Sequence, residues 1–293
     1  MHIKHGYHIQ KMPHVYKLLT GVAICMSTAL GFVYMPKLCA AQGAALFNKI
    51  VPVTTEPVKI SPVTMIFPPP PPPPPPKPKV MGVFTGIEFR NLYENFASPN
   101  TQKTTSPPPI TGDEIADQRI RDLAINRGYT LRSVATASLV TIDGFLLQSP
   151  AAQAWQEMKT RALAEGIGLR LAYGYRSFAQ AQTMFVNKLT AAGITPQMIE
   201  AGTADATINT ILQTVTIPGY SKHHSGYTVD IGCSTGGTFA NTPCFNWLNK
   251  NNYANAKKFG WIPSYPDGGG AQGPNPEPWE YVWVGVDTLM RTQ

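Results

Sequence analysis

The chain has 293 residues, enough for one or two domains. It carries 24 Lys and Arg residues against 17 Asp and Glu residues, and the excess lies near the N-terminus: residues 1–112 hold 10 basic and 3 acidic side chains, whereas residues 113–293 hold 14 of each. The neutral C-terminal part argues against nucleic-acid binding, and the basic N-terminal part is typical of a segment near an anionic membrane.

Residues 1–41 have the pattern of an export signal. Three lysines precede residues 18–35, a run of 18 residues without a charge. A cleavable signal peptide would end near Cys39-Ala40-Ala41, where small residues stand. An uncleaved membrane anchor, formed by an apolar helix, is equally open because 18 apolar residues just reach across a bilayer. In both cases the basic flank predicts that the C-terminal bulk lies outside the cytoplasm.

Residues 42–112 are interpreted as a proline-rich linker. Seventeen prolines fall between Pro52 and Pro109, and nine of them are consecutive, at residues 68–76. Nine residues of polyproline II span about 28 Å, so the run is typical of a stiff spacer. A docking site for a partner and low-complexity drift are the alternatives. Residues 81–96 include apolar side chains that can order locally.

Residues 113–293 mix helix and strand patterns without a regular βαβ period. Asp143-Gly144 indicates a hairpin within residues 131–147, and Ser149 is the expected cap of the helix that follows. Together the patterns predict an α+β fold with a small, mainly antiparallel sheet flanked by helices. The expected helices cover 113–126, 151–165, 178–192, part of 195–212 and 245–259, and the expected strands 167–172, 229–232, 261–266 and 277–284.

The stretch from Ser221 to Asp230 places a hydroxyl, an imidazole and a carboxylate within ten residues. His223 and Asp230 are seven positions apart and would point to opposite faces of a continuous strand. The chain must therefore turn at Gly226 if both side chains bind one ion. Imidazole nitrogen and carboxylate oxygen are zinc ligands, and a catalytic zinc site has three protein ligands and one open position.

Two further polar motifs accompany this stretch. Arg176 and Ser177 follow an apolar strand, and Glu277 and Glu280 lie in the last predicted strand, 277–284. In a metal hydrolase a carboxylate takes a proton from water and a cation stabilises the oxyanion. Glu277 could be that base and Arg176 that cation. Taken alone, each pair is also common on an ordinary protein surface or at a helix cap.

The order of these motifs resembles the VanY type of D-alanyl-D-alanine carboxypeptidase, within the zinc peptidases that include lysostaphin-like enzymes and hedgehog domains. The resemblance covers residues 127–286. Its most specific parts are Gly174-Tyr175-Arg176-Ser177, Pro218-Gly219-Tyr220-Ser221 with His223, Gly226 and Asp230, and Glu277-Pro278-Trp279.

The resemblance implies a role for each of these side chains. His223 and Asp230 would bind zinc, Glu277 would be the general base, and Arg176 would hold the scissile carbonyl. Contacts with the substrate would come from Ser221, Ser177 and Trp279. The implied substrate is the D-Ala-D-Ala end, or a cross-link, of peptidoglycan stem peptides.

One position departs from the family pattern. The family has a zinc-binding histidine three residues after the catalytic glutamate, and this chain has Glu280 there. Residues 113–293 contain only His223 and His224, so the ligand set is His223, Asp230 and Glu280, or it is incomplete. Two carboxylates make a harder site, which could favour a divalent ion other than Zn²⁺. His224 is a poor substitute because adjacent residues on a strand point apart.

Cys233 and Cys244 bracket a glycine-rich loop after the strand that carries Asp230. An oxidising compartment outside the cytoplasm would favour a disulfide between them. Cys233 as a metal ligand is the alternative.

These features favour a metal-dependent peptidoglycan peptidase in the cell envelope, periplasmic or extracytoplasmic, secreted or anchored to the inner membrane. One alternative is a cell-wall-binding module of the same fold that has lost its metal, suggested by Glu280. Another is a TonB-like spanning protein, suggested by the apolar and proline-rich segments. The expected partners are stem peptides, with a protein on the proline run if that run is a docking site and the membrane if the apolar segment is uncleaved. No nucleic acid is expected.

Overall fold

A four-stranded antiparallel sheet carries the candidate site. The computed structural model describes residues 76–292. The strands are β6 (Leu169–Tyr173), β7 (Thr228–Cys233), β8 (Trp261–Pro263) and β9 (Glu280–Trp283), in the order β6-β7-β9-β8. All three neighbouring pairs are antiparallel, which confirms the predicted α+β fold with a small antiparallel sheet.

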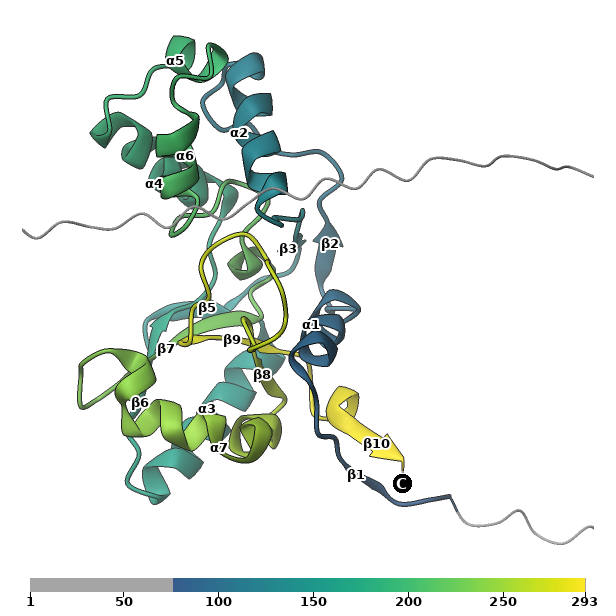
Figure 1. Ribbon diagram of the computed structural model, residues 1–293. Helices are drawn as coiled ribbons and strands as arrows, with labels where there is room; N and C mark the ends of the chain where they lie inside the picture. Colours follow the sequence, from purple (N-terminus) through teal and green to yellow (C-terminus); the bar gives the residue numbers. More distant parts are fainter. Residues whose placement is uncertain (1–75, 293) are drawn as a thin grey trace, which may run out of the picture. The chain divides into compact units, whose positions relative to one another are not determined.

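One face of the sheet is apolar and is covered by two long helices, α3 (Ser149–Ala164) and α7 (Pro243–Lys257) (Figure 1). Trp155 and Met158 of α3 and Leu248 of α7 pack against Val229 and Ile231 of β7. Because side chains alternate along a strand, Asp230 points to the opposite face. The buried core therefore lies on one side of β7 and the polar site on the other.

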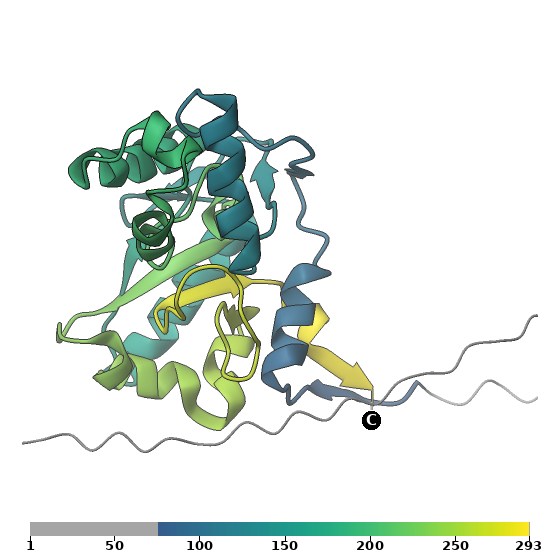
Figure 2. The same ribbon diagram turned by 45° about the horizontal axis from the view of Figure 1, so that its top comes forward.

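A second group of helices lies beyond the polar face of the sheet (Figures 1 and 2). It consists of α2 (Glu114–Asn126), α4 (Phe178–Ala191), α5 (Pro196–Glu200) and α6 (Asp205–Ile211). Its own apolar core includes Ile120, Phe185 and Ile208. The Asp113 carboxylate caps α2 by accepting a hydrogen bond from the Ala116 N–H. The helices expected at 113–126 and 178–192 are confirmed.

Regular structure begins before residue 113. Strand β1 (Lys79–Met81) pairs with β10 (Met290–Thr292), and β2 (Thr101–Lys103) pairs with β3 (Ser133–Ala135). Between them, α1 (Gly86–Glu94) buries Phe89 together with Phe84 against Val282 and Leu289. These three-residue strands are too short to show an alternating pattern in the sequence.

Turn residues explain the local geometry of the hairpin and of α7. Strands β4 (Val140–Ile142) and β5 (Phe145–Leu147) are joined through Asp143 and Gly144, both with positive φ, as a two-residue hairpin turn requires. Helix α7 is interrupted at Lys250–Tyr253, where Asn251 and Asn252 adopt the left-handed conformation that Asn tolerates. The predicted cap of α3 is wrong. Ser149 is already helical, and the cap position is Gln148, without a side-chain hydrogen bond.

The short helical turns are η1 (Lys222–Ser225), η2 (Phe239–Asn241) and η3 (Asp287–Leu289). Residues 18–35 and the proline run up to residue 75 lie outside the described residues, so the predicted export signal and spacer stay predictions. Within residues 76–292, no helix combines the length and the apolar character needed to span a bilayer.

Candidate metal centre

Three segments bring the predicted ligands together. Asp230 and Glu280 are opposite each other on the neighbouring strands β7 and β9. His223 comes from the turn η1, where the Ser221 hydroxyl accepts a hydrogen bond from the His223 N–H. Gly226 ends this turn with a φ of 74°, a left-handed conformation that glycine adopts without strain. The turn predicted at Gly226 is confirmed.

The ligand atoms converge on one point. His223 Nε2 lies 3.4 Å from Asp230 Oδ1 and 3.2 Å from Glu280 Oε2, and the candidate ligand atoms of the three residues all lie within 4.8 Å of one another. His223 Nδ1 is 2.7 Å from the Gly174 carbonyl oxygen. If Nδ1 carries the proton and donates it there, Nε2 is left with a free lone pair toward the carboxylates.

Several buried polar atoms around this point have no hydrogen-bond partner in the described part of the protein. Among the side chains of residues 76–292, those with buried atoms that lack a hydrogen-bond partner include Asp230 at Oδ1, Arg176 at Nε and Thr216 at Oγ1. All three residues line the same pocket of about 60 Å³, together with His223 and Glu280. One water needs only about 10–15 Å³ of such space. The donor set and the pocket therefore fit a divalent cation with a bound water.

The electrostatics of the site favour a positive charge between the two acids. Burial alone would lower the pKa of His223, but Asp230 and Glu280 outweigh it and raise this pKa to about 10. A divalent cation would replace the proton that the carboxylates stabilise on the imidazole. Burial opposes ionisation of Glu280, yet the hydrogen bond and charge of His223 lower its pKa.

Glu277 lines the same pocket, but its pKa is shifted in the direction opposite to that of Glu280. Burial, followed by repulsion from Glu280 and Asp230, raises the pKa of Glu277 above its ordinary value. Two neighbouring carboxyl groups with pKa values shifted in opposite directions are typical of a proton carrier beside a charged ligand.

The remaining predicted residues have different positions. Arg176 and Ser221 line the pocket, whereas Ser177 and Trp279 do not. The Ser177 hydroxyl caps α4 by accepting from the Gln180 N–H. Trp279, immediately before β9, is 37% exposed. The substrate contacts expected of Ser177 and Trp279 stay predictions.

His224 is already satisfied by the protein. Its Nδ1 lies 2.6 Å from the Arg176 carbonyl oxygen, and its Nε2 accepts a hydrogen bond from the Gly219 N–H at 3.1 Å. Burial lowers its pKa to about 4, which keeps the ring neutral. His224 therefore supports the two loops around the site and does not act as a ligand.

Lys222, for which no sequence motif predicts a role, is 4% exposed beside the candidate ligands. Its ammonium group donates to Ser264 O and Ser264 Oγ, both at 2.8 Å, and to Gln272 Oε1 at 3.2 Å. Burial lowers the pKa of Lys222 to about 7, and Glu280 opposes this shift. Three acceptors match the three donors of an ammonium, whereas a neutral amine has two. Its one signal in the sequence is its place between Ser221 and His223, two predicted site residues.

A disulfide joins Cys233, at the end of β7, to Cys244, near the start of α7. It ties the strand that carries Asp230 to one of the helices that cover the sheet. With its sulfur in this bond, Cys233 is not a metal ligand.

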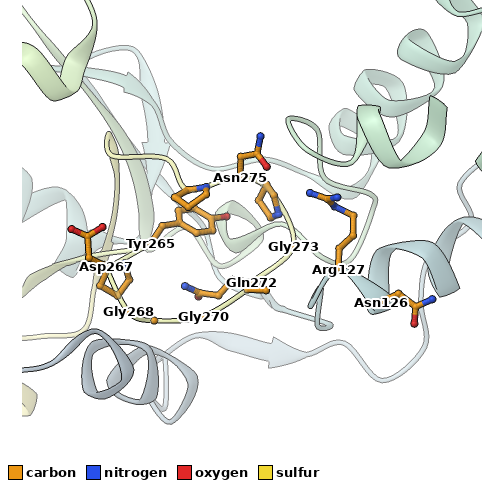
Figure 3. A pocket seen from close by; sticks show the side chains of 14 residues that line it. Asn126, Arg127, Tyr265, Asp267, Gly268, Gly270, Gln272, Gly273 and Asn275 are labelled. Carbon is orange, nitrogen blue, oxygen red and sulfur yellow. The ribbon is translucent and has the colours of Figure 1, made fainter. Parts of the chain in front are cut away.

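A larger pocket of about 580 Å³ lies beside the candidate centre (Figure 3). The glycine-rich loop at residues 266–276 forms one wall, and Arg127 extends into it from the end of α2. Tyr265 and Pro274 line both this pocket and the smaller one. The two spaces are therefore adjacent.

Comparison with known proteins shows a similarity to one family. The VanY family, described as D-alanyl-D-alanine carboxypeptidase, matches residues 144–286. A D-alanyl-D-alanine carboxypeptidase of Enterococcus faecalis is 32% identical over 142 residues, which cover 46% of this chain and 47% of the relative. One of Enterococcus faecium is 27% identical over 214 residues, covering 68% and 63%. The chain thus spans about half of the first relative's length and slightly under two thirds of the second's.

Solved structures give weaker matches. A vancomycin-resistance D,D-pentapeptidase VanY in complex with Zn(II) is 23% identical and has a TM-score of 0.38, covering 63% of this chain and 86% of that chain. VanYB in complex with D-alanine-D-alanine is 22% identical and has a TM-score of 0.39, covering 64% and 86%. On the sequence matches, residues 144–286 are similar to the VanY family of D-alanyl-D-alanine carboxypeptidases.

Proposed function

We propose that the protein is a metal-dependent peptidoglycan peptidase that removes the terminal D-alanine from stem peptides. The observation that carries this proposal is the convergence of His223, Asp230 and Glu280 around an unpaired buried oxygen, with Glu277 on the same pocket. The similarity to D-alanyl-D-alanine carboxypeptidases supports the substrate class. An endopeptidase acting on a cross-link would use the same chemistry.

We infer that His223, Asp230 and Glu280 hold a divalent cation, with Zn²⁺ as the first expectation. Such a cation, when bound, lowers the pKa of a water and polarises a peptide carbonyl. The presence of two carboxylates leaves room for a harder divalent ion. The Zn(II) complex of a VanY structure is in keeping with this assignment.

The chain's own residues supply the proton transfers and the binding contacts. The Glu277 carboxylate accepts a proton from the attacking water and then passes it to the departing D-alanine amine. Arg176 lines the pocket and its buried Nε lacks a partner among the described residues, so its guanidinium can donate to the carbonyl oxygen as it becomes negative. Ser221 lines the same pocket and can donate to the terminal carboxylate of the substrate. Further substrate contacts are assigned to Ser177 and Trp279.

A cell-envelope location follows from this substrate. The disulfide between Cys233 and Cys244 suits an oxidising compartment. We propose that residues 1–41 direct export or anchor the chain, and that the predicted linker at 42–112 acts as a spacer only up to residue 75, because β1, α1 and β2 lie in its remainder. The reading as a binding module without a metal is not favoured, because the three candidate ligands converge.

The test is release of D-alanine from a pentapeptide that ends in D-Ala-D-Ala by the full chain. We expect turnover that EDTA abolishes and that Zn²⁺ restores. A peptide that ends in D-Ala-L-Ala is the matched control substrate and should be stable. No release after loading with Zn²⁺, Mn²⁺ or Co²⁺ would contradict the proposal.

A further inference from the structure

Glu280 is held by partners that treat its two carboxylate oxygens differently. Oε2 lies 3.2 Å from His223 Nε2 and faces the candidate metal position. Oε1 accepts a hydrogen bond from the Ser264 hydroxyl, and Lys222 Nζ lies 3.9 Å away from it. One oxygen is therefore directed to the site and the other is bound by the protein.

The side chains around Glu280 Oε1 are buried and hydrogen-bonded to one another. Lys222, Ser264, Gln272 and Glu280 are each at most 4% exposed. The Ser264 hydroxyl accepts a hydrogen bond from Lys222 Nζ and donates one to Glu280, so it links the two side chains. A further bond, from the Ser264 N–H to the Glu280 carbonyl oxygen at 3.0 Å, joins the end of β8 to the start of β9.

Lys222 has no freedom to act on a substrate. Its three donors are occupied by Ser264 and Gln272, and its Nζ lies 3.7 Å from the centre of the Tyr265 ring. Gln272 and Tyr265 both come from the loop after β8 that Figure 3 shows. The lysine is thus a positioning group with a positive charge close to Glu280.

We infer that Lys222 and Ser264 hold Glu280 as a one-oxygen ligand and offset its negative charge. This inference rests on the proposed metal centre. A carboxylate can bind a metal through one oxygen or through both. With Oε1 occupied, only Oε2 is left for the cation, so Glu280 occupies one position, as a single nitrogen of an imidazole would. Such a ligand keeps the coordination number low, as zinc sites require.

Removal of the contacts that Lys222 and Ser264 make with Glu280 should change the metal selectivity of the site. In Lys222→Met or Ser264→Ala, Glu280 can bind through both oxygens, which favours cations of higher coordination number. Loss of the lysine charge affects all divalent ions alike and cancels in a ratio of affinities. We expect the Mn²⁺ affinity relative to the Zn²⁺ affinity to rise by about tenfold.

The experiment uses the full chain and metal ions alone as probes. Binding of Zn²⁺ and Mn²⁺ is measured by competition with a chelating dye, and the visible spectrum is recorded after loading with Co²⁺. The parent should show the intense bands of four-coordinate cobalt, and both variants should show weaker bands of higher coordination. Ser264→Thr keeps a hydroxyl and should restore the parent spectrum and ratio.

Lys257→Met is the matched control. Lys257 is also a buried lysine, 1% exposed, and its Nζ donates to Gly82 O and Asn252 Oδ1, away from the candidate ligands. This variant should lose stability but keep the parent's affinity ratio and spectrum. If Lys222→Met does not fold by circular dichroism, Ser264→Ala and Ser264→Thr decide the matter.

The outcomes separate the two proposals. A parent chain that binds no Zn²⁺ or Co²⁺ would overturn the metal centre itself, and this inference with it. A parent that binds metal, with folded variants that keep its ratio and spectrum, would overturn the inference alone. An equal change in Lys257→Met would also overturn it, because the effect would then be general.

Discussion

At the scale of single residues, the site combines two glutamates of opposite character within four positions. Glu280 is 4% exposed and keeps a lowered pKa through His223, whereas burial raises the pKa of Glu277. We therefore propose that the same side-chain chemistry serves as a charged ligand in one place and as a proton carrier in the other. Environment, rather than residue type, separates the two roles.

Substitution of the proposed base tests this separation. Glu277→Gln removes the group that accepts the proton and keeps the shape of the side chain, so turnover should fall by about 10²- to 10⁴-fold. The zinc content, measured by atomic emission, should stay that of the parent. Loss of metal from this variant would indicate that Glu277 is a ligand instead.

At the scale of elements, the site depends on the β7–β9 register and on the turn before β7. Asp230 pairs with Glu280 across the two strands, and His223 reaches them because η1 ends at Gly226. A shift of one residue in either strand would turn its carboxylate to the apolar face. The β7–β9 register and this turn therefore decide whether the three proposed ligands can meet.

Gly226→Ala tests the turn. A Cβ at this position would lie 3.0 Å from Leu139 Cδ2 and 3.2 Å from Gln148 Cγ, and the left-handed backbone alone costs about 1–2 kcal/mol in a residue with a Cβ. We expect a lower free energy of unfolding in urea and a weaker Zn²⁺ affinity, because η1 carries His223.

Gly166→Ala is the control for this variant. Gly166 has a φ of 77°, and no atom lies within 4 Å of the position that its Cβ would take. It should lose a similar stability from backbone strain and keep the parent's Zn²⁺ affinity. Equal loss of Zn²⁺ affinity in both variants would contradict a specific role for the turn at Gly226.

The disulfide is a second device at this scale. Cys233 and Cys244 are 11 positions apart, and a bond that closes a loop of this size stabilises by about 2–4 kcal/mol. A double variant, Cys233→Ala with Cys244→Ala, should lower the free energy of unfolding by that amount in urea titrations. A parent measured under reducing conditions should match the variant, and an unchanged midpoint in both would argue against the contribution.

At the scale of the whole described chain, residues 79–103 lie before the part that matches the VanY family and pack against later segments of the chain. Strand β1 pairs with β10, and Arg132 binds the Glu94 carboxylate of α1 at 2.8 Å. Lys257 of α7 donates to the Gly82 carbonyl oxygen at 2.6 Å. Residues 79–103 therefore provide partners for two buried cations of the part that begins at residue 113.

Truncation tests this role. A chain that starts at residue 113 would leave Arg132 without Glu94 and Lys257 without Gly82 O, and each buried donor that loses a partner costs about 1–3 kcal/mol. It should unfold at a clearly lower urea concentration than a chain that starts at residue 76. Equal midpoints would mean that the segment adds little to stability.

Part of this architecture could be predicted from the sequence. The helices at 113–126 and 178–192 have periodic apolar residues and capping side chains, which are local signals. The three-residue strands β1, β2 and β10 have no such signal, because their stability comes from pairing with distant segments. The left-handed residues in α7 also interrupt a pattern that reads as one continuous helix.

The same division holds for the site. The motif order, the family resemblance and the chemical types of His223, Asp230 and Glu280 follow from residue identity and spacing alone. The contacts of Lys222 with Ser264 and Gln272, 42 and 50 positions away, exist only in the folded chain. Antiparallel pairing and burial of apolar faces bring such distant groups together, and a local sequence pattern contains no record of these long-range contacts.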